Sequence, residues 1–330
     1  MRLLASLLPL ILILACNSSP TPPSLGISAQ SFANSEWSEP VHLDAPINSP
    51  FRELGAALST DELSIYFGSN RPDPTAQGAF DIWVSHRACR ECPWEDPVNL
   101  GPNINSPGGD GSPMLSHDGH LLFFSGSRAG GQGGEDIWVS RRTDPNDDLS
   151  WGPPVNLGPE VNTTANEGAP AYVPALEGGG ASLYFDRQGT TDAGSDIYEV
   201  PVTRDGEALG PAARVAELNS PLDDLGARVR ADGREVFFWS DRPGGMGLSD
   251  IWVATRRSPQ DPWSTPENVG PMINTPRADL TPSLSWDGRT LLFSAAAAAR
   301  PSLGLQDIWM STRTPSGTER SCIVGVYNST

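Results

Sequence analysis

Short apolar runs separated by turn signals recur along most of the chain. One run reads Asp-Ile-Trp-Val-Ser or a close variant and returns every 54 to 60 residues. Its five copies begin at Asp81, Asp136, Asp196, Asp250 and Asp307. Ahead of each copy lies a second run that is apolar on consecutive positions, as at 121–124. Such runs, bounded by Gly, Pro and Asp, predict strands, and consecutive apolar residues predict burial on both faces.

Each repeat divides into four strand-like pieces. In the second repeat they fall at 110–116, 121–124, 136–140 and 151–157. An Asp-Gly pair separates the first two pieces, which is a strong hairpin signal. The prolines of the fourth piece suit an edge strand, where the ladder requires no donor. The repeat therefore predicts a four-stranded antiparallel sheet of about 55 residues.

An all-β sheet that is buried on both faces and repeated five times predicts a five-bladed β-propeller, here over residues 37–312. The last repeat ends near Ser311 without a fourth piece, whereas one such piece at 37–43 precedes the first repeat. We expect this N-terminal strand to complete the last blade and close the ring. Residues 313–330 then form a C-terminal tail, or they supply a competing closing strand.

Composition agrees with this fold and excludes some partners. The 34 Gly and 32 Pro residues favour turns over long helices. The 22 basic residues are all Arg, and 40 acidic residues give a net charge of −18. Nucleic acid and anionic lipid surfaces both require a basic face, so we expect neither to be bound through charge. The expected oligomeric state is a monomer.

The first residues have the character of an export signal. Arg2 precedes an apolar stretch at 3–14, which is too short to span a bilayer, so residues 1–15 are expected to be a signal peptide. The stretch ends in Ile-Leu-Ala before Cys16 and resembles the bacterial lipobox, in which the Cys is acylated. Residues 16–36 are rich in Ser and Pro and are expected to form a lipidated tether. The protein would then be lipid-anchored in a bacterial envelope, at the outer membrane facing the periplasm or the cell surface.

The pattern Ser-x-Asp-Gly-x-x-Leu-x-Phe-x-Ser-x-Arg, followed by Asp-Ile-Trp-Val, resembles the WD40-like repeat of TolB-type propellers. The resemblance covers residues 37–312. It implies a propeller of the kind found in bacterial envelope lipoproteins. It implies no particular activity, because propellers support binding, scaffolding and catalysis alike.

Five acidic residues begin the first strand of each repeat and are expected to line one mouth of the central channel. They are Glu53, Asp110, Glu167, Asp224 and Asp279. Several carboxylates together can hold a polar ligand or a hard cation such as calcium. The alternative is structural, because every blade would use such an acid to accept backbone N–H bonds or to pair with Arg.

An Arg follows the second strand in four repeats, on the same face of the ring as the acids. These residues are Arg71, Arg128, Arg187 and Arg242. They are expected either to form ion pairs between blades or to recognise carboxylate groups of a partner. The fifth repeat has Ala297 in this place, so asymmetry is expected there.

The other chemistry-bearing residues are few. Most Trp and Phe residues occupy repeat positions and are expected to pack between blades, whereas Trp239 and Trp286 lie outside them and are better candidates for exposure. Cys89 and Cys92 are expected to form a local disulfide, and Cys322 has no evident partner. No metal ligand set is evident.

These observations predict a noncatalytic binding or scaffold module, not an enzyme, whose partner is an envelope protein or a polysaccharide. No Ser, His or Cys stands in a recognisable catalytic motif. The alternative is a glycan-active hydrolase that uses two inner-strand carboxylates. An enzyme would show one deep pocket with a perturbed acid pair, whereas a scaffold would show a shallow, near-fivefold mouth.

Overall fold

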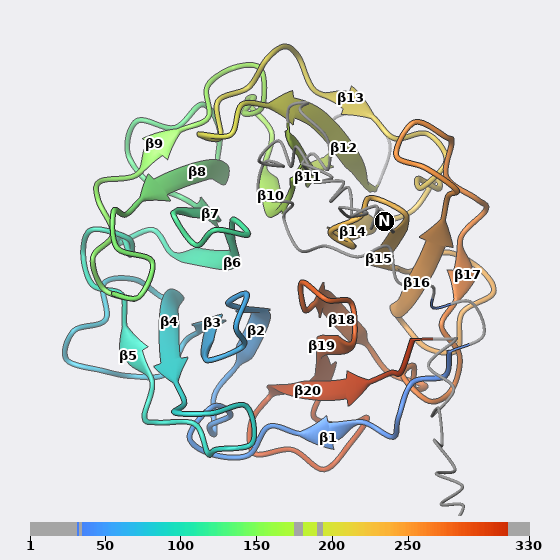
Figure 1. The fold of residues 1–330 in the computed structure, drawn as a ribbon, viewed down its shortest axis with the longest axis horizontal. Helices are drawn as coiled ribbons and strands as arrows, with labels where there is room; N and C mark the ends of the chain where they lie inside the picture. Colours follow the sequence, from blue (N-terminus) through green and yellow to red (C-terminus); the bar gives the residue numbers. More distant parts are fainter. Residues whose placement is uncertain (1–31, 33–34, 175–180, 190–193, 316–330) are drawn as a thin grey trace, which may run out of the picture.

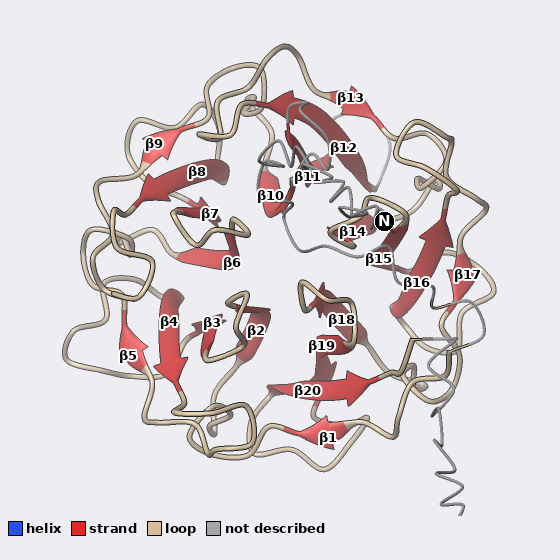
Figure 2. Cartoon of the chain, in the orientation of Figure 1, coloured by secondary structure: helices blue, strands red, loops and turns tan. Residues whose placement is uncertain are grey.

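The computed structural model describes residues 32, 35–174, 181–189 and 194–315. Five four-stranded antiparallel sheets stand around a central axis, as Figure 1 shows, and all the regular structure of the described residues is strand (Figure 2). The prediction of an all-β, five-bladed propeller is confirmed. Within the described residues, no helix is long and apolar enough to cross a membrane.

Every blade has three longer strands and one short outer strand. Blade 1 contains β2 (Glu53–Leu58), β3 (Ser64–Ser69), β4 (Asp81–His86) and β5 (Val98–Asn99). Blade 2 contains β6 (Asp110–Leu115), β7 (Leu121–Gly126), β8 (Asp136–Arg141) and β9 (Val155–Asn156). Blade 3 contains β10 (Glu167–Val173), β11 (Ala181–Gln188), β12 (Ser195–Val202) and β13 (Ala213–Arg214). Blade 4 contains β14 (Asp224–Val229), β15 (Glu235–Ser240), β16 (Asp250–Thr255) and β17 (Glu267–Asn268).

Blade 5 is assembled from both ends of the chain. It contains β18 (Asp279–Leu284), β19 (Thr290–Ala296) and β20 (Gln306–Thr312), and its outer strand is β1 (Val41–His42). Val41 pairs with Met310 and His42 with Trp309 (Figure 1). The expected closure of the ring by the N-terminal strand is therefore confirmed.

The second strand of each blade is buried on both faces, as its consecutive apolar residues predict. Phe67, Phe124, Phe185 and Phe238 have no exposed surface, and Phe293 is 1% exposed. Their neighbours along the strand are equally buried, so each sheet is covered on both sides by the adjoining blades. The core is thus a ring of interfaces between blades.

A repeated Asn fixes the segment that leads from each blade to the next. The side-chain oxygen of Asn105 accepts the N–H of Ile82, and its amide nitrogen donates to the carbonyl oxygen of the same Ile. The same double hydrogen bond joins Asn162 to Ile137 and Asn274 to Ile251. Asn48 bonds Ile308 and Asn219 bonds Ile197 in the same way. The amide extends the ladder where the two-residue outer strand leaves the third strand without a partner.

An Arg at the end of the third strand stacks on the Trp that opens the fourth piece. The Arg–Trp distances are 4.3 Å for Arg87 and Trp94 and 4.5 Å for Arg313 and Trp37. Trp37 therefore packs in blade 5, as ring closure requires. Blade 3 has lost both partners together, because Val202 and Ala208 occupy these two positions.

The Asn clamp generates a prediction about stability. Asn274→Ala leaves the N–H and the carbonyl of Ile251 buried without this partner, so the free energy of unfolding should fall by about 3 kcal/mol. Denaturant unfolding would measure the change. The exposed Asn146, which bonds only within its own loop, is the matched control, and Asn146→Ala should change stability by less than about 0.5 kcal/mol. Equal losses in the two variants would contradict the role assigned to the amide.

Candidate active site

The five repeated acids are buried, each in its own blade. Glu53, Glu167, Asp224 and Asp279 have no exposed surface, and Asp110 is 3% exposed. Each carboxylate accepts the backbone N–H of the residue four positions before it, as Glu167 does from Thr163 at 3.0 Å. In four blades the acid also pairs with the Arg that follows the second strand, as in Glu167–Arg187 at 2.8 Å and Glu53–Arg71 at 3.1 Å. Asp110 pairs with Arg128 and Asp224 with Arg242 in the same manner.

These Arg side chains also bind the backbone of the segment between blades. Arg187 donates to the carbonyl oxygen of Val161 at 2.7 Å, and its guanidinium lies 4.4 Å from the ring of Tyr198. The structure thus joins the sequence-predicted acids and Arg residues into separate ion pairs and does not gather the five acids at one point. In the described part of the chain, no group of three or more His, Cys, Asp and Glu side chains could hold a metal ion.

Blade 5 replaces its missing Arg from further along the chain. Arg300 donates to the carbonyl oxygen of Ile273 at 2.7 Å and lies over Phe293 and Trp309, as the other four Arg residues lie over their own aromatic pairs. It does not neutralise Asp279 as closely, because one oxygen of Asp279 has no hydrogen-bond partner. Burial raises the pKa of Asp279 to about 6. The fifth blade is therefore less exceptional than its sequence suggests.

The fivefold symmetry breaks at the junctions between blades, close to where the inner strands begin. Two positions face each junction. One is the residue of the second strand that pairs with the second residue of the inner strand; these are Gly68, Ser125, Asp186, Trp239 and Ser294. The other directly precedes the Asp of the third strand; these are Phe80, Glu135, Ser195, Ser249 and Gln306. At every junction one of the two is Gly or Ser and the other is larger.

The larger members form what we call the junction set. They are Phe80, Glu135, Asp186, Trp239 and Gln306. Backbone bonds place the second position beside the next inner strand, as from the N–H of Asp110 to the carbonyl of Phe80 at 2.8 Å and from Glu167 to Glu135 at 2.8 Å. The five members differ from blade to blade, although the surrounding framework repeats. This variation is typical of residues that are selected for a specific contact and not for blade geometry.

Asp186 is the most perturbed acid of this set. Its side chain is buried at the junction of blades 3 and 4, and its Oδ1 accepts the N–H of Gly226 at 3.0 Å. The pKa of Asp186 is raised to about 7, chiefly by burial and also by the negative charge of Glu135, against the opposing effects of the Gly226 N–H and Arg228. A carboxyl group that still holds its proton near neutral pH can act as a proton donor.

Glu135 is the second acid, one junction away. It is half-buried, and burial raises its pKa, while a hydrogen bond from Ser125 lowers it and the charge of Asp110 raises it. The charge of Glu135 in turn raises the pKa of Asp186. These two perturbed acids meet one part of the criterion by which the sequence analysis distinguishes an enzyme from a scaffold.

Arg228 lies beside this pair and belongs to the next blade. Its Nη1 donates to the carbonyl oxygens of Ala169 at 2.9 Å and Pro170 at 3.0 Å, and its Nε is buried without a partner. Burial lowers the pKa of Arg228 to about 10, which leaves the side chain charged at neutral pH. Other blades have Ala57, Met114, Ala171 or Ser283 here, so Arg228 also departs from the repeat.

Sequence reasoning missed Glu135, Asp186 and Arg228 because it favoured residues that recur. The available signal was the opposite one, a charged residue where the aligned repeats have Gly, Ser or an apolar side chain. Of the two aromatic residues expected to be exposed, Trp239 joins the junction set. Trp286 lies at the other end of the channel, where its ring meets that of His117 at 5.0 Å across the axis.

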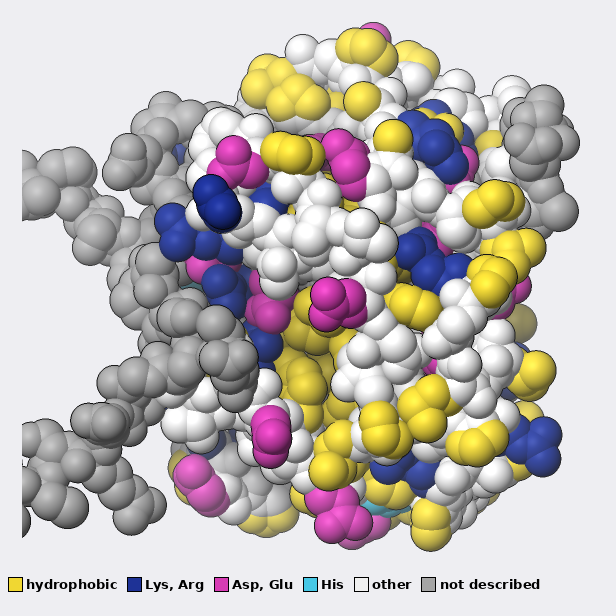
Figure 3. Space-filling model, turned by 90° about the vertical axis from the view of Figure 1, so that its right-hand side faces the viewer, with side chains coloured by type: hydrophobic (Ala, Val, Ile, Leu, Met, Phe, Trp, Pro, Cys, Tyr) yellow, Lys and Arg dark blue, Asp and Glu magenta, His cyan; other side chains and the backbone are white. Residues whose placement is uncertain are grey.

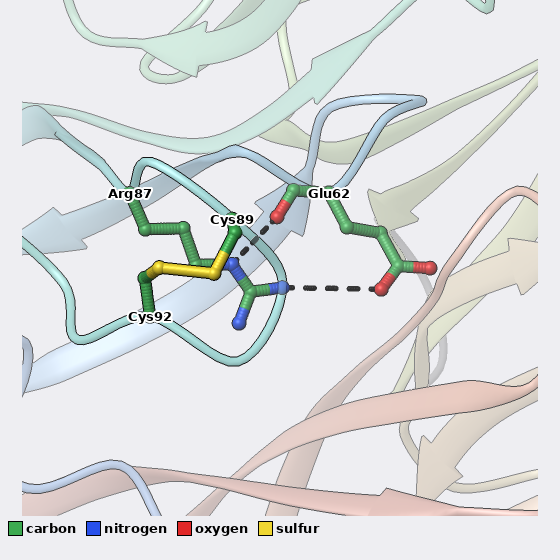
Figure 4. Close-up of a disulfide and its surroundings, with 4 residues drawn as sticks. All are labelled: Glu62, Arg87, Cys89 and Cys92. Carbon is green, nitrogen blue, oxygen red and sulfur yellow. Dashed lines mark hydrogen bonds and ion pairs between the residues drawn. A yellow bond between two sulfur atoms is a disulfide. The ribbon is translucent and has the colours of Figure 1, made fainter.

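The predicted disulfide is present and lies away from the junction set. Cys89 and Cys92 are joined in the loop before the fourth strand of blade 1, next to the contact of Arg87 with Glu62 (Figure 4). Cys16 and Cys322 lie outside the described residues, as do most of the tether and tail.

The side of the ring in Figure 3 shows acidic and basic side chains interspersed, with no continuous basic face.

Comparison with known proteins identifies the fold. No family model and no curated protein sequence matches the chain. Among solved structures, an α-L-arabinofuranosidase from Lactobacillus brevis shares 13% identity over 82% of this chain and 92% of its own, with a TM-score of 0.55. A GH43_1 enzyme from Xanthomonas citri, complexed with xylotriose, shares 15% identity over 83% of this chain and 89% of its own, with a TM-score of 0.54.

A structure described as TolB from Agrobacterium tumefaciens is also similar, at 18% identity over 74% of this chain and 70% of its own. Its TM-score of 0.44 is too low to support the TolB-type resemblance specifically. What the comparison supports is the five-bladed ring. The expectation of a noncatalytic scaffold that is not an enzyme was wrong, because the solved rings that match it are predominantly glycoside hydrolases.

The coupling of the two acids can be measured. In Glu135→Gln the pKa of Asp186 should fall below its value of about 7, because the substitution removes a negative charge that raises it. Carboxyl carbon NMR titration would follow the change, with the resonance identified by its absence in Asp186→Asn. Glu267→Gln, at an exposed residue of β17, is the control and should leave the Asp186 titration unchanged. An unchanged pKa in Glu135→Gln would show that the two carboxyls are independent.

Proposed function

We propose that the protein is a glycan-active hydrolase and that Asp186 and Glu135 are its carboxyl pair. The observation that carries the proposal is the pair itself. In a framework that repeats five times, two acids at successive junctions depart from the repeat; burial raises both pKa values, and the charge of Glu135 adds to the shift of Asp186. The recurring acids are less suited to catalysis, because in four blades each is bound to an Arg and to a backbone N–H.

The pKa values suggest the role of each acid. Asp186 is the proposed general acid, since it keeps its proton to about pH 7. In the proposed step the glycosidic C–O bond breaks and the Asp186 proton passes to the leaving oxygen. Water adds its hydroxyl to the anomeric carbon, and Glu135 takes the remaining proton. The sum of these transfers is the addition of one water across the bond.

Arg228 supports this division of roles. Its charge beside Asp186 lowers the pKa of that carboxyl and so favours transfer of the proton from Asp186 to the leaving oxygen. Its bonds to Ala169 and Pro170 hold the inner strand of blade 3 against blade 4. We regard Arg228 as a positioning residue, because its Nη1 is bound to two backbone carbonyl groups of the neighbouring blade.

The substrate class follows from the solved relatives in fold. One of them is an α-L-arabinofuranosidase, and another is complexed with xylotriose. We propose pentose-containing glycans for this chain. We also propose that the chain acts as an exported monomer held to the envelope by lipid on Cys16. The polysaccharide that the sequence analysis expects as a binding partner would then be the substrate.

Hydrolysis of aryl glycosides tests the proposal directly. The purified protein should release p-nitrophenol from an α-L-arabinofuranoside or a β-D-xyloside. Glu135→Gln and Asp186→Asn should each lower kcat by about 10²- to 10⁴-fold, because each removes one proton transfer. Above about pH 7 the wild-type rate should decline as Asp186 loses its proton.

The controls separate chemistry from folding. Glu267→Gln and Asp205→Asn change exposed acids on the outer strand and in a surface loop, and should retain wild-type rates. Thermal unfolding would establish that the inactive variants are folded. Two results would refute the proposal: no turnover across a panel of pentose and hexose aryl glycosides, or wild-type rates in both acid variants.

A further inference from the structure

Trp239 is the member of the junction set whose large side chain is not explained by the geometry of the blade. At the same position in the second strand, the other blades have Gly68, Ser125, Asp186 and Ser294. The Trp residues that recur in the third strands are buried; Trp83 is 3% exposed and Trp252 is 6% exposed. Trp239 is only half-buried, although it lies in the most buried strand of its blade. A large aromatic ring that remains partly open in a packed strand calls for a reason other than packing.

One residue connects Trp239 to the acid pair. The edge of the indole lies against Gly226, where an added Cβ would come within 3.0 Å of both Cδ1 and Nε1 of Trp239. The N–H of the same Gly226 donates to Asp186. Gly226 has a φ of +63°, so a side chain there would be strained in any case. Trp239 and the proposed general acid therefore touch the same backbone unit from two sides.

The second position at the junction of blades 4 and 5 leaves the indole ring of Trp239 uncovered. At the junction of blades 1 and 2, Phe80 fills the space that Gly68 leaves, because an added Cβ on Gly68 would lie 2.4 Å from the Phe80 ring. Phe80 also lies against Gly111, so its face is used in packing. At the junction of blades 4 and 5 the companion is Ser249, which is too small to cover an indole.

We infer that Trp239 is the platform on which a sugar ring of the substrate lies, next to Asp186, and that it determines which sugars are accepted. This inference rests on the proposed function. The flat indole offers a large apolar face, which matches the C–H face of a sugar, while its Nε1–H can donate to a hydroxyl. A sugar ring stacked on Trp239 is held beside the proton donor Asp186. Aromatic walls with a few polar groups are typical of small-ligand sites.

The variants that test this platform separate aromatic character from size. Trp239→Phe keeps an aromatic face, whereas Trp239→Leu keeps bulk without one. With the aryl glycoside that the wild type hydrolyses, KM should rise about 10- to 100-fold in Trp239→Leu and only a few-fold in Trp239→Phe. The kcat should change less than KM in both variants, because neither carboxyl is removed. Trp286→Phe, at the opposite end of the channel, is the control and should keep the wild-type KM.

Binding without turnover distinguishes failure of this inference from failure of the proposed function. Calorimetric titration of Glu135→Gln with xylotriose or an arabino-oligosaccharide should show binding, and the double variant with Trp239→Leu should lose it. If the wild type hydrolyses glycosides and Trp239→Leu has an unchanged KM, the platform is refuted and the hydrolase stands. If hydrolysis is absent but binding depends on Trp239, the platform stands and the hydrolase is refuted. Absence of both hydrolysis and binding across the panel would refute both.

Discussion

The double hydrogen bond between an Asn amide and the Ile of the third strand determines where each new blade begins. The outer strand pairs over only two residues, so the backbone alone would hold the crossing segment loosely. The Asn amide extends that ladder and fixes the segment on the blade just completed. Five residues later the next inner strand starts with an acid that accepts a backbone N–H of the same segment. The position of every inner strand therefore depends on an amide of the preceding blade.

This arrangement separates the residues that build the ring from those that are free to vary. The Asn, the inner-strand acid and the Arg that binds it are occupied by contacts that every blade uses. At each junction the only shared requirement on the two positions is that one of the two residues is small. Asp186, Glu135 and Trp239 can therefore differ between blades without disturbing the frame. Blade 3, which carries Asp186, also lacks the Arg–Trp stack, with Val202 and Ala208 in its place.

The sequence predicted the fold well because the evidence for it was repeated five times. The Asp-Ile-Trp-Val runs, the Asn landmarks and the unpaired N-terminal strand together imply five blades and their closure. The candidate site was harder to predict. Recurrence drew attention to Glu53 and its equivalents, whose function in the structure is local. Recognising Asp186 required the strand register, because only the pairing of Gly168 with Asp186 shows which residues of other blades correspond to it.

Arg300 shows a second limit of repeat analysis. It stands three residues beyond the position at which blades 1, 2 and 4 have their Arg, so alignment places Ala297 there instead. In space, its guanidinium reaches the same carbonyl and the same aromatic pair. Loop length can thus change while a contact is kept, which a linear pattern cannot show. The residual difference, a less neutralised Asp279, is visible only in three dimensions.

The closure of the ring by β1 also determines how the protein bears mechanical load. The strand that completes blade 5 is continuous with the N-terminal segment, so a pull on that segment acts first on the pairing of β1 with β20. Only two residues pair there, and the remaining resistance comes from Ser38, which bonds the backbone of Thr312, and from Trp37 under Arg313. Asn48 then anchors the chain to Ile308. Under tension the molecule would open at this blade before any other, and the remaining four blades would stay joined to one another.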